Sequence, residues 1–193
     1  MQNNLGSAAT SFGDPSWIDR LDVLFANLYF AAVTTAHQRG TAAVPRAWRP
    51  LFENRFAGDV ARIQFALAGM NAHINRDLVV ALLALYDEAG AAPADGSVQH
   101  RDFTLVDALL ERVQQRVSAT LWVGTPLVFG GHLAPLETLV ASWSVSHARQ
   151  AAWDHSQAFW QLRWLPMIRR ASLDSLDGLA QLAGHGLLVR VLP

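Results

Sequence analysis

The stretch that decides the fold runs from residue 59 to residue 88 and reads DVARIQFALAGMNAHINRDLVVALLALYDE. Apolar residues recur in it every three or four positions, which is the spacing of one helix face. The other faces also carry apolar side chains, among them Phe65, Val79 and Leu83. A helix that is apolar nearly all round is usually central in a globular protein. The pattern therefore predicts a long, buried, central helix over residues 59–88.

Four polar residues, Asn71, His73, Asn75 and Asp77, stand in this helix where the pattern demands burial. At about 100° per residue, Asp77 falls inside the apolar stripe, and His73 lies one turn before it on the same side. An ionised carboxylate is very costly to bury alone, so Asp77 must be paired, bound to a metal or protonated. His73 is its nearest candidate partner. The alternative is a structural network in which these four side chains only satisfy neighbouring helices.

The rest of the chain predicts further helices. Asp14 and Pro15 read as an N-cap followed by Pro at the first helical position. The helices are expected over 15–38, 46–56, 102–121, 136–165 and 173–183. Together with the central helix they predict an all-α, single-domain bundle of about five to six helices over residues 14–193, after a flexible N-terminus at 1–13. Residues 127–129 are expected to tuck under the core, and 187–192 to form a docked strand or extended segment.

The composition of the 193 residues excludes several kinds of chemistry. There is no Cys, and all 15 basic residues are Arg. Disulfides, thiolate nucleophiles, Schiff-base lysines and phosphate-loop lysines are therefore absent. The use of Arg throughout, with abundant Ala, Val and Leu, suggests a GC-rich bacterial genome.

The charge and hydropathy patterns bear on partners and location. The formal charge is −1, and we expect no basic stretch interleaved with aromatic residues, so neither a nucleic acid nor an anionic membrane is expected as a partner. No run reaches the ~18 uninterrupted apolar residues of a membrane span. The first residues do not read as a secretion signal, so a cytoplasmic location is expected. The apolar tail at 187–192 suggests an interface and hence a homodimer.

A second candidate segment lies on the expected helix at 136–165. One of its faces carries Trp143, His147, Gln150 and Asp154, and the next face carries Arg149 and Trp153. This predicts a pocket wall in which indoles supply apolar surface and polar groups orient a ligand. The alternative is a solvated polar stripe beside tryptophans that belong to the core.

The metal-ligand patterns are sparse. The chain contains neither Glu-x-x-His nor His-Glu-x-x-His. Only His73 and Asp77 have ligand spacing on one helix, with His147, Asp154 or Asp22 as a third ligand. No cofactor is favoured, and a divalent metal remains an alternative.

Four stretches of the sequence carry a family resemblance. The specific one is Met70–Leu78, MNAHINRDL, and the others are RLDVLFAN at 20–27, VPRAWR at 44–49 and SHARQAAW at 146–153. In these stretches the sequence resembles the bacterial domain-of-unknown-function 5995 family. The resemblance implies a helical domain with no established reaction. It also implies that the family pattern includes Asp22, Asn27, His73, Asn75, Asp77 and Arg149. Gln150 stands where an acidic residue is expected, which puts a site using that position in doubt.

These observations lead to three functional hypotheses. The favoured one is a cofactor-independent enzyme, an isomerase, cyclase or lyase, that acts on an apolar small molecule in a Trp-lined pocket between helices. His73 and Asp77 would be its general acid/base pair. The residues expected to bind the substrate are Asn71, Asn75, Asp22, Asn27, Trp143, His147, Arg149 and Trp153. The second is a metal-dependent hydrolase or oxygenase, and the third is a non-catalytic binder of an apolar ligand.

Overall fold

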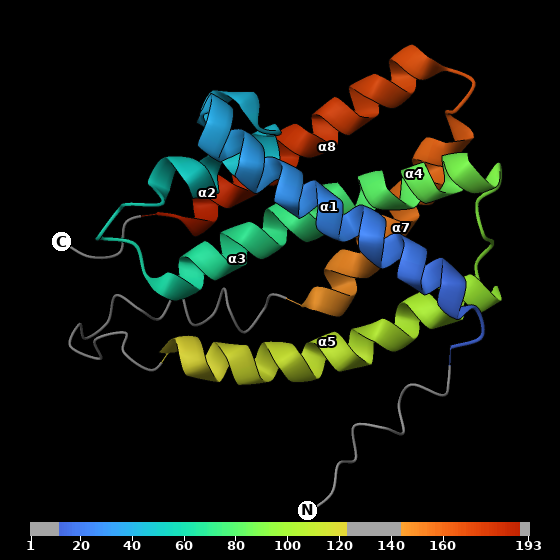
Figure 1. Ribbon diagram of the computed structural model, residues 1–193, viewed down its shortest axis with the longest axis horizontal. Coiled ribbons are helices and arrows are strands. Elements are labelled where there is room, and N and C mark those ends of the chain that lie inside the picture. The colour runs from blue at the N-terminus through green and yellow to red at the C-terminus, as the bar shows by residue number, and fades with distance from the viewer. Residues whose placement is uncertain (1–11, 123–143, 190–193) are drawn as a thin grey trace, which may run out of the picture.

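A computed structural model describes residues 12–122 and 144–189, without the side chains of 111–122. Within these ranges the regular elements are all helices, which confirms the predicted all-α bundle (Figure 1). None of the helices in the described ranges combines the length and apolar character needed to cross a bilayer.

The central helix is confirmed, and it has an unexpected interruption. It consists of α3 (Arg62–Ala72), a π-helical segment η3 (His73–Leu78) and α4 (Val79–Ala89). It ends at Gly90, whose φ of 68° lies in the left-handed region that glycine tolerates. A π-helical turn holds one more residue than an α-helical turn, and such turns occur frequently at functional sites. Here the wide turn coincides with the polar residues His73, Asn75 and Asp77.

The other helices surround this element. Helix α1 (Pro15–Arg39) crosses in front of it, and Asp14 caps α1 by accepting a hydrogen bond from the Trp17 amide, as predicted (Figure 1). Two short turns, η1 (Thr41–Ala43) and η2 (Arg46–Trp48), lead into α2 (Arg49–Asn54). Helices α5 (Val98–Trp122) and α7 (Val145–Gln161) pack on each other, and α7 also packs on α4 and η3. Helix α8 (Pro166–Leu187) packs on α3 and η2.

Several boundaries differ from the sequence-based prediction. Helix α7 ends at Gln161, four residues before the expected Leu165, because the amides of Leu162 and Arg163 turn back to the carbonyls of Phe159 and Trp160. Helix α8 begins at Pro166, where the fixed φ of proline suits the first helical position. It continues to Leu187, so the start of the expected strand or extended tail is helical instead. Residues 127–129, 136–143 and 190–193 lie outside the described residues.

The N-terminal segment is anchored where its description begins. The carboxylate of Asp102 on α5 accepts hydrogen bonds from the amides of Gly13 (2.9 Å) and Asp14 (2.6 Å). Gly13, expected in a flexible N-terminus, is therefore tied to α5. Residues 1–11 lie outside the described part of the chain.

The largest core cluster lies between α4, α5, α7 and α1. Its aromatic centre is Trp153, whose ring meets Tyr86, Phe103 and Trp17 at centroid distances of 6.4, 5.2 and 6.3 Å. The hydroxyl of Tyr86 bonds to Ser156. Burial raises the pKa of Tyr86 to about 12.

Candidate functional site

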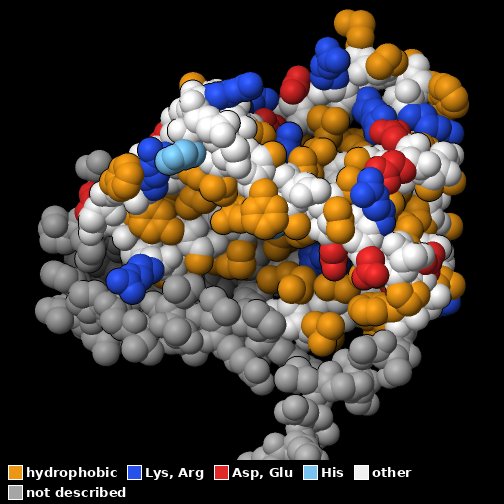
Figure 2. Space-filling view, viewed as in Figure 1, with side chains coloured by type: hydrophobic (Ala, Val, Ile, Leu, Met, Phe, Trp, Pro, Cys, Tyr) orange, Lys and Arg blue, Asp and Glu red, His pale blue; other side chains and the backbone are white. Residues whose placement is uncertain are grey.

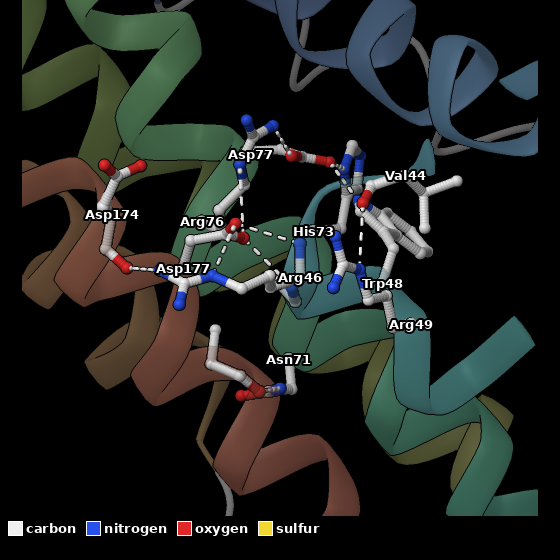
Figure 3. Close-up of polar contacts among 12 residues, drawn as sticks. Val44, Arg46, Trp48, Arg49, Asn71, His73, Arg76, Asp77, Asp174 and Asp177 are labelled. Carbon is white, nitrogen blue, oxygen red and sulfur yellow. Dashed lines mark hydrogen bonds and ion pairs between the residues drawn. The ribbon is translucent and has the colours of Figure 1, made fainter. Parts of the chain in front are cut away.

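Asp77 is the buried centre of a polar cluster. Its side chain is 0% exposed. Oδ2 accepts the indole N–H of Trp48 at 2.9 Å and lies 3.2 Å from Nδ1 of His73, while Oδ1 accepts a guanidinium N–H of Arg76 at 2.6 Å. These contacts converge on one carboxylate, as the dashed lines in Figure 3 show. Asp77 therefore meets the requirement that a buried carboxylate be paired on both oxygens.

His73 connects this carboxylate to the surface. Its side chain is 24% exposed. Facing an ionised carboxylate, which only accepts hydrogen bonds, a neutral His73 would carry its ring hydrogen on Nδ1 and would leave Nε2 as the acceptor nitrogen. The described residues form no hydrogen bond to Nε2, and Nε2 is not among their buried unpartnered atoms.

Aromatic rings hold the imidazole of His73 in place. Phe25 of α1 stacks on it at 3.7 Å between centroids, and Tyr29 and Trp48 lie at 5.8 and 6.0 Å. Tyr29 is exposed, so the group of aromatic rings around His73 reaches the solvent on the side of α1. The site thus combines a nitrogen acceptor with an aromatic wall.

A further carboxylate supports the cluster from α8. Asp177 accepts hydrogen bonds from the amides of Arg46 and Ala47, each at 2.9 Å, which fixes the start of η2. Its oxygens also lie 3.7 Å from Nε of Arg46 and 3.8 Å from Nε of Arg76 (Figure 3). Arg76 is therefore shared by Asp77 and Asp177. Because η2 ends at Trp48, Asp177 also positions the indole that binds Asp77.

The side chains of Asn71 and Asn75, expected to bind the substrate, form their hydrogen bonds with partners other than His73 and Asp77. The amide of Asn71 donates to the carbonyl of Ala180 on α8 at 2.7 Å, and Asn75 donates to Asn71 at 2.9 Å. Asn71 thus joins α3 to α8, and Asn75 of η3 binds Asn71. Asn71 is buried because α8 covers it.

The expected Trp-lined pocket wall on α7 is also corrected. Trp153 is a core residue, and its indole N–H is donated to Asp95 at 2.8 Å. His147 and Asp154 are exposed, because α7 buries its opposite face. Gln150 donates to Asp154 on this solvated stripe. Trp143 lies outside the described residues, and the tryptophan at the site is Trp48.

Arg149 belongs to a separate buried cluster. It forms an ion pair with Asp107, donates to the carbonyl of Phe103 at 3.0 Å and lies over the Phe103 ring. Burial lowers the pKa of Arg149, and the charge of Asp107 acts in the opposite direction. These contacts describe a structural tie between α5 and α7.

Asp22 and Asn27 lie on the exposed side of α1. Although Asp22 is exposed as a residue, packing around its carboxyl raises its pKa, and the charge of nearby Arg149 lowers it. Neither residue is joined to His73 or Asp77 by the hydrogen bonds and ion pairs of the described residues. The expectation that both contact a substrate at that pair stays a prediction.

The metal-dependent alternative requires side chains that converge as ligands. Within 12–122 and 144–189, no group of three or more His, Asp or Glu side chains converges as metal ligands would. The proposed third ligand, His147, is exposed on α7, apart from the contacts of His73 and Asp77.

Comparison with known proteins places the chain in a family. A family model described as a family of unknown function, DUF5995, matches residues 1–190. The chain belongs to the DUF5995 family. The predicted resemblance is thereby confirmed. Comparisons of this DUF5995 protein with curated proteins and with solved structures found no match.

Sequence reasoning missed part of the site of this DUF5995 protein. Trp48 and Arg46 lie in the VPRAWR stretch, and Arg76 lies inside the MNAHINRDL stretch, so the motif resemblance already contained them. Asp177 lay beyond every recognised stretch. The shared contact with Arg76 arises only when α8 folds against η3.

Proposed function

We propose that this protein is an enzyme for aromatic or other apolar small molecules, in which His73 transfers a proton and Asp77 is its positioning residue. The observation that carries the proposal is the geometry at Oδ2 of Asp77. The same oxygen meets Trp48 Nε1 and His73 Nδ1, and this fixes the imidazole with Nε2 turned away from the carboxylate. Such carboxylate–imidazole pairs hold the tautomer and stabilise the imidazolium formed in the reaction.

The division of roles follows from burial. Asp77 has no solvent-exposed side-chain surface, and Arg76 and Trp48 occupy its oxygens. A substrate therefore meets the edge of His73 first. The sequence-based hypothesis treated the two residues as an equal acid/base pair, and the geometry favours His73 as the group that touches substrate.

The aromatic side chains around His73 indicate the class of substrate. Phe25 and Tyr29 lie beside the imidazole, and Phe30, next to Tyr29, is exposed on α1. Aromatic walls favour ligands with a flat apolar surface. Nε2 would remove a proton from a carbon or oxygen of the ligand. Return of that proton to another atom gives isomerisation, and departure of a leaving group with the bonding electron pair gives elimination.

A direct test uses a probe reaction that needs only a base in an apolar site. 5-Nitrobenzisoxazole loses its ring C–H proton to a base while its N–O bond breaks, and the product is a coloured phenolate. The wild-type protein should accelerate this elimination at least about tenfold relative to His73→Ala, since a positioned base contributes roughly 10²–10⁴-fold with its own substrate.

The controls separate the competing explanations. His37→Ala removes an exposed histidine at the end of α1 and should leave the rate unchanged. Equal rates for wild type and His73→Ala would overturn the proposal. A rate that disappears with a chelator and returns with added zinc or manganese would instead support the metal-dependent alternative. Circular dichroism of each variant establishes that the helical fold is retained.

A further inference from the structure

The corner between α7 and α8 exposes a continuous apolar run. Its residues, Trp164 to Ile168, are called here the corner tip. Trp164 is 78% exposed, Leu165 51%, Met167 85% and Ile168 51%, with Pro166 exposed between them. Monomeric soluble proteins rarely expose contiguous large apolar side chains without a reason. In Figure 2 hydrophobic side chains project at the upper right, over the start of α8, with Arg side chains beside them.

Three arginines flank the corner tip. Arg163 precedes it, and its guanidinium carbon lies 5.0 Å from the Trp160 ring and 5.3 Å from the Trp164 ring. Arg169 and Arg170 follow it directly. Arg169 pairs with Asp87 at 2.9 Å, yet its Nε is buried and finds no hydrogen-bond partner among the described residues. The flank therefore holds an excess of positive charge and one donor without an acceptor.

These arginines line a hollow. Its volume is about 390 Å³, and all three guanidinium side chains and Asp87 contribute to its wall. Leu83, Pro166 and Leu173 supply apolar lining. A hollow with arginines beside apolar surface suits a ligand that joins an anionic group to hydrocarbon. A phospholipid has this chemistry, with a phosphate that accepts hydrogen bonds from arginine.

We propose that the α7–α8 corner docks on an anionic phospholipid surface. The corner tip enters the boundary between headgroups and acyl chains, where Trp and other large apolar side chains are favoured. The three arginines bind lipid phosphate. Docking of this kind requires no spanning helix.

The sequence-based expectation excluded an anionic membrane on the formal charge of −1 and on the lack of a basic stretch interleaved with aromatic residues. The formal charge is an average over the whole chain, and residues 163–170, RWLPMIRR, do combine arginines with an aromatic residue. The corner gathers three of the 15 arginines next to five consecutive apolar residues. Attraction to a charged surface falls off within about one Debye length, so the local charge decides it. The proposal shares no residue with the His73 site and stands independently of it.

The test is co-sedimentation of the full chain with vesicles. Wild type should bind vesicles that contain phosphatidylglycerol much more tightly than vesicles of phosphatidylcholine alone, and high salt should weaken this binding. Met167→Asp should weaken binding at least about tenfold, because it places a charge in the inserted tip. Arg170→Gln should weaken binding to the vesicles that contain phosphatidylglycerol and should leave binding to the phosphatidylcholine vesicles unchanged.

Phe56→Asp is the matched control, since Phe56 is 87% exposed and lies before α3, outside the corner. It should leave binding unchanged. Equal binding to both vesicle types, or equal loss in Phe56→Asp and Met167→Asp, would overturn the proposal. A dimer in solution that Met167→Asp converts to monomer, without vesicle binding by wild type, would show instead that the corner tip joins two copies of the chain. Circular dichroism checks that each variant is folded.

Discussion

The imidazole of His73 lies flat against the ring of Phe25, with 3.7 Å between the ring centroids and 6° between the ring planes. This stack fixes the plane of the imidazole, and the contact with Asp77 fixes its rotation within that plane. Together they leave the Nε2 edge as the part of the ring that is turned away from the carboxylate. Two elements far apart in the sequence, α1 and η3, thus define the orientation of one side chain.

Replacement of Phe25 by Leu tests the stack. The variant keeps an apolar side chain but loses the ring contact, so we expect a loss of about 1 kcal/mol in the free energy of unfolding. The rate with the benzisoxazole probe should fall several-fold, because the imidazole gains freedom. Urea denaturation and the probe assay measure the two effects. An unchanged probe rate would show that the stack does not position His73.

Replacement of Trp48 by Phe tests the hydrogen bond to Asp77. A smaller aromatic ring remains, but the indole N–H and part of the buried volume are lost, so Oδ2 of Asp77 loses one donor and a cavity is left. A hydrogen bond to a charged group contributes about 1.5–3 kcal/mol, and we expect a loss of stability of at least that size. Denaturant unfolding measures it. A loss well below 1 kcal/mol would mean that the carboxylate finds another donor.

The structure also predicts how stability changes at high pH. Burial raises the pKa of Tyr86 from 10.0 to about 12, because the charged form is disfavoured in the core. The stability that this group contributes is fully present below pH 10 and is lost as the pH rises toward 12. The loss is about 2–3 kcal/mol, at ~1.4 kcal/mol for each pH unit of difference.

The composition of the chain allows the titration of Tyr86 to be measured separately. The chain has no Lys, no Cys and only two Tyr, so Tyr29→Phe leaves Tyr86 as the single tyrosine. Its ultraviolet titration should be centred near pH 12 while the protein remains folded. Titration near pH 10 in the folded protein would contradict the burial of the hydroxyl.

Replacement of Arg149 tests whether this residue is structural or belongs to the His73 site. Replacement by Met removes the guanidinium that forms an ion pair with the largely buried carboxylate of Asp107. Breaking such a pair costs about 3–5 kcal/mol, and we expect a loss of stability of that order. The probe rate of the folded variant should be unchanged, because Arg149 serves the α5–α7 contact. A lost probe rate with retained stability would return Arg149 to the site.

The sequence was sufficient for the fold class and for the burial of Asp77. Both followed from the apolar periodicity of residues 59–88, which reports how a helix packs whatever its partners are. It also placed His73 within reach of Asp77, because residues four apart on a helix are neighbours. The π-helical turn could not be read in this way, since a wheel of about 100° per residue assumes a regular α-helix.

The remaining differences arise from contacts between distant segments. Asn71 was expected to face a substrate, but Ala180, 109 positions away, accepts its hydrogen bond. Trp153 was expected in a pocket wall, but Asp95 and the aromatic core enclose it. Local spacing shows that such side chains are buried, whereas the packing of other helices decides what they face.

The orientation of His73 is measured most directly by nitrogen-15 NMR of histidine-labelled protein, which distinguishes a protonated ring nitrogen from an unprotonated one. In the neutral form of His73 the account predicts a proton on Nδ1 and none on Nε2, and loss of this preference in a folded Asp77→Asn variant. A proton on Nε2 in wild type, or the same tautomer in both proteins, would contradict it.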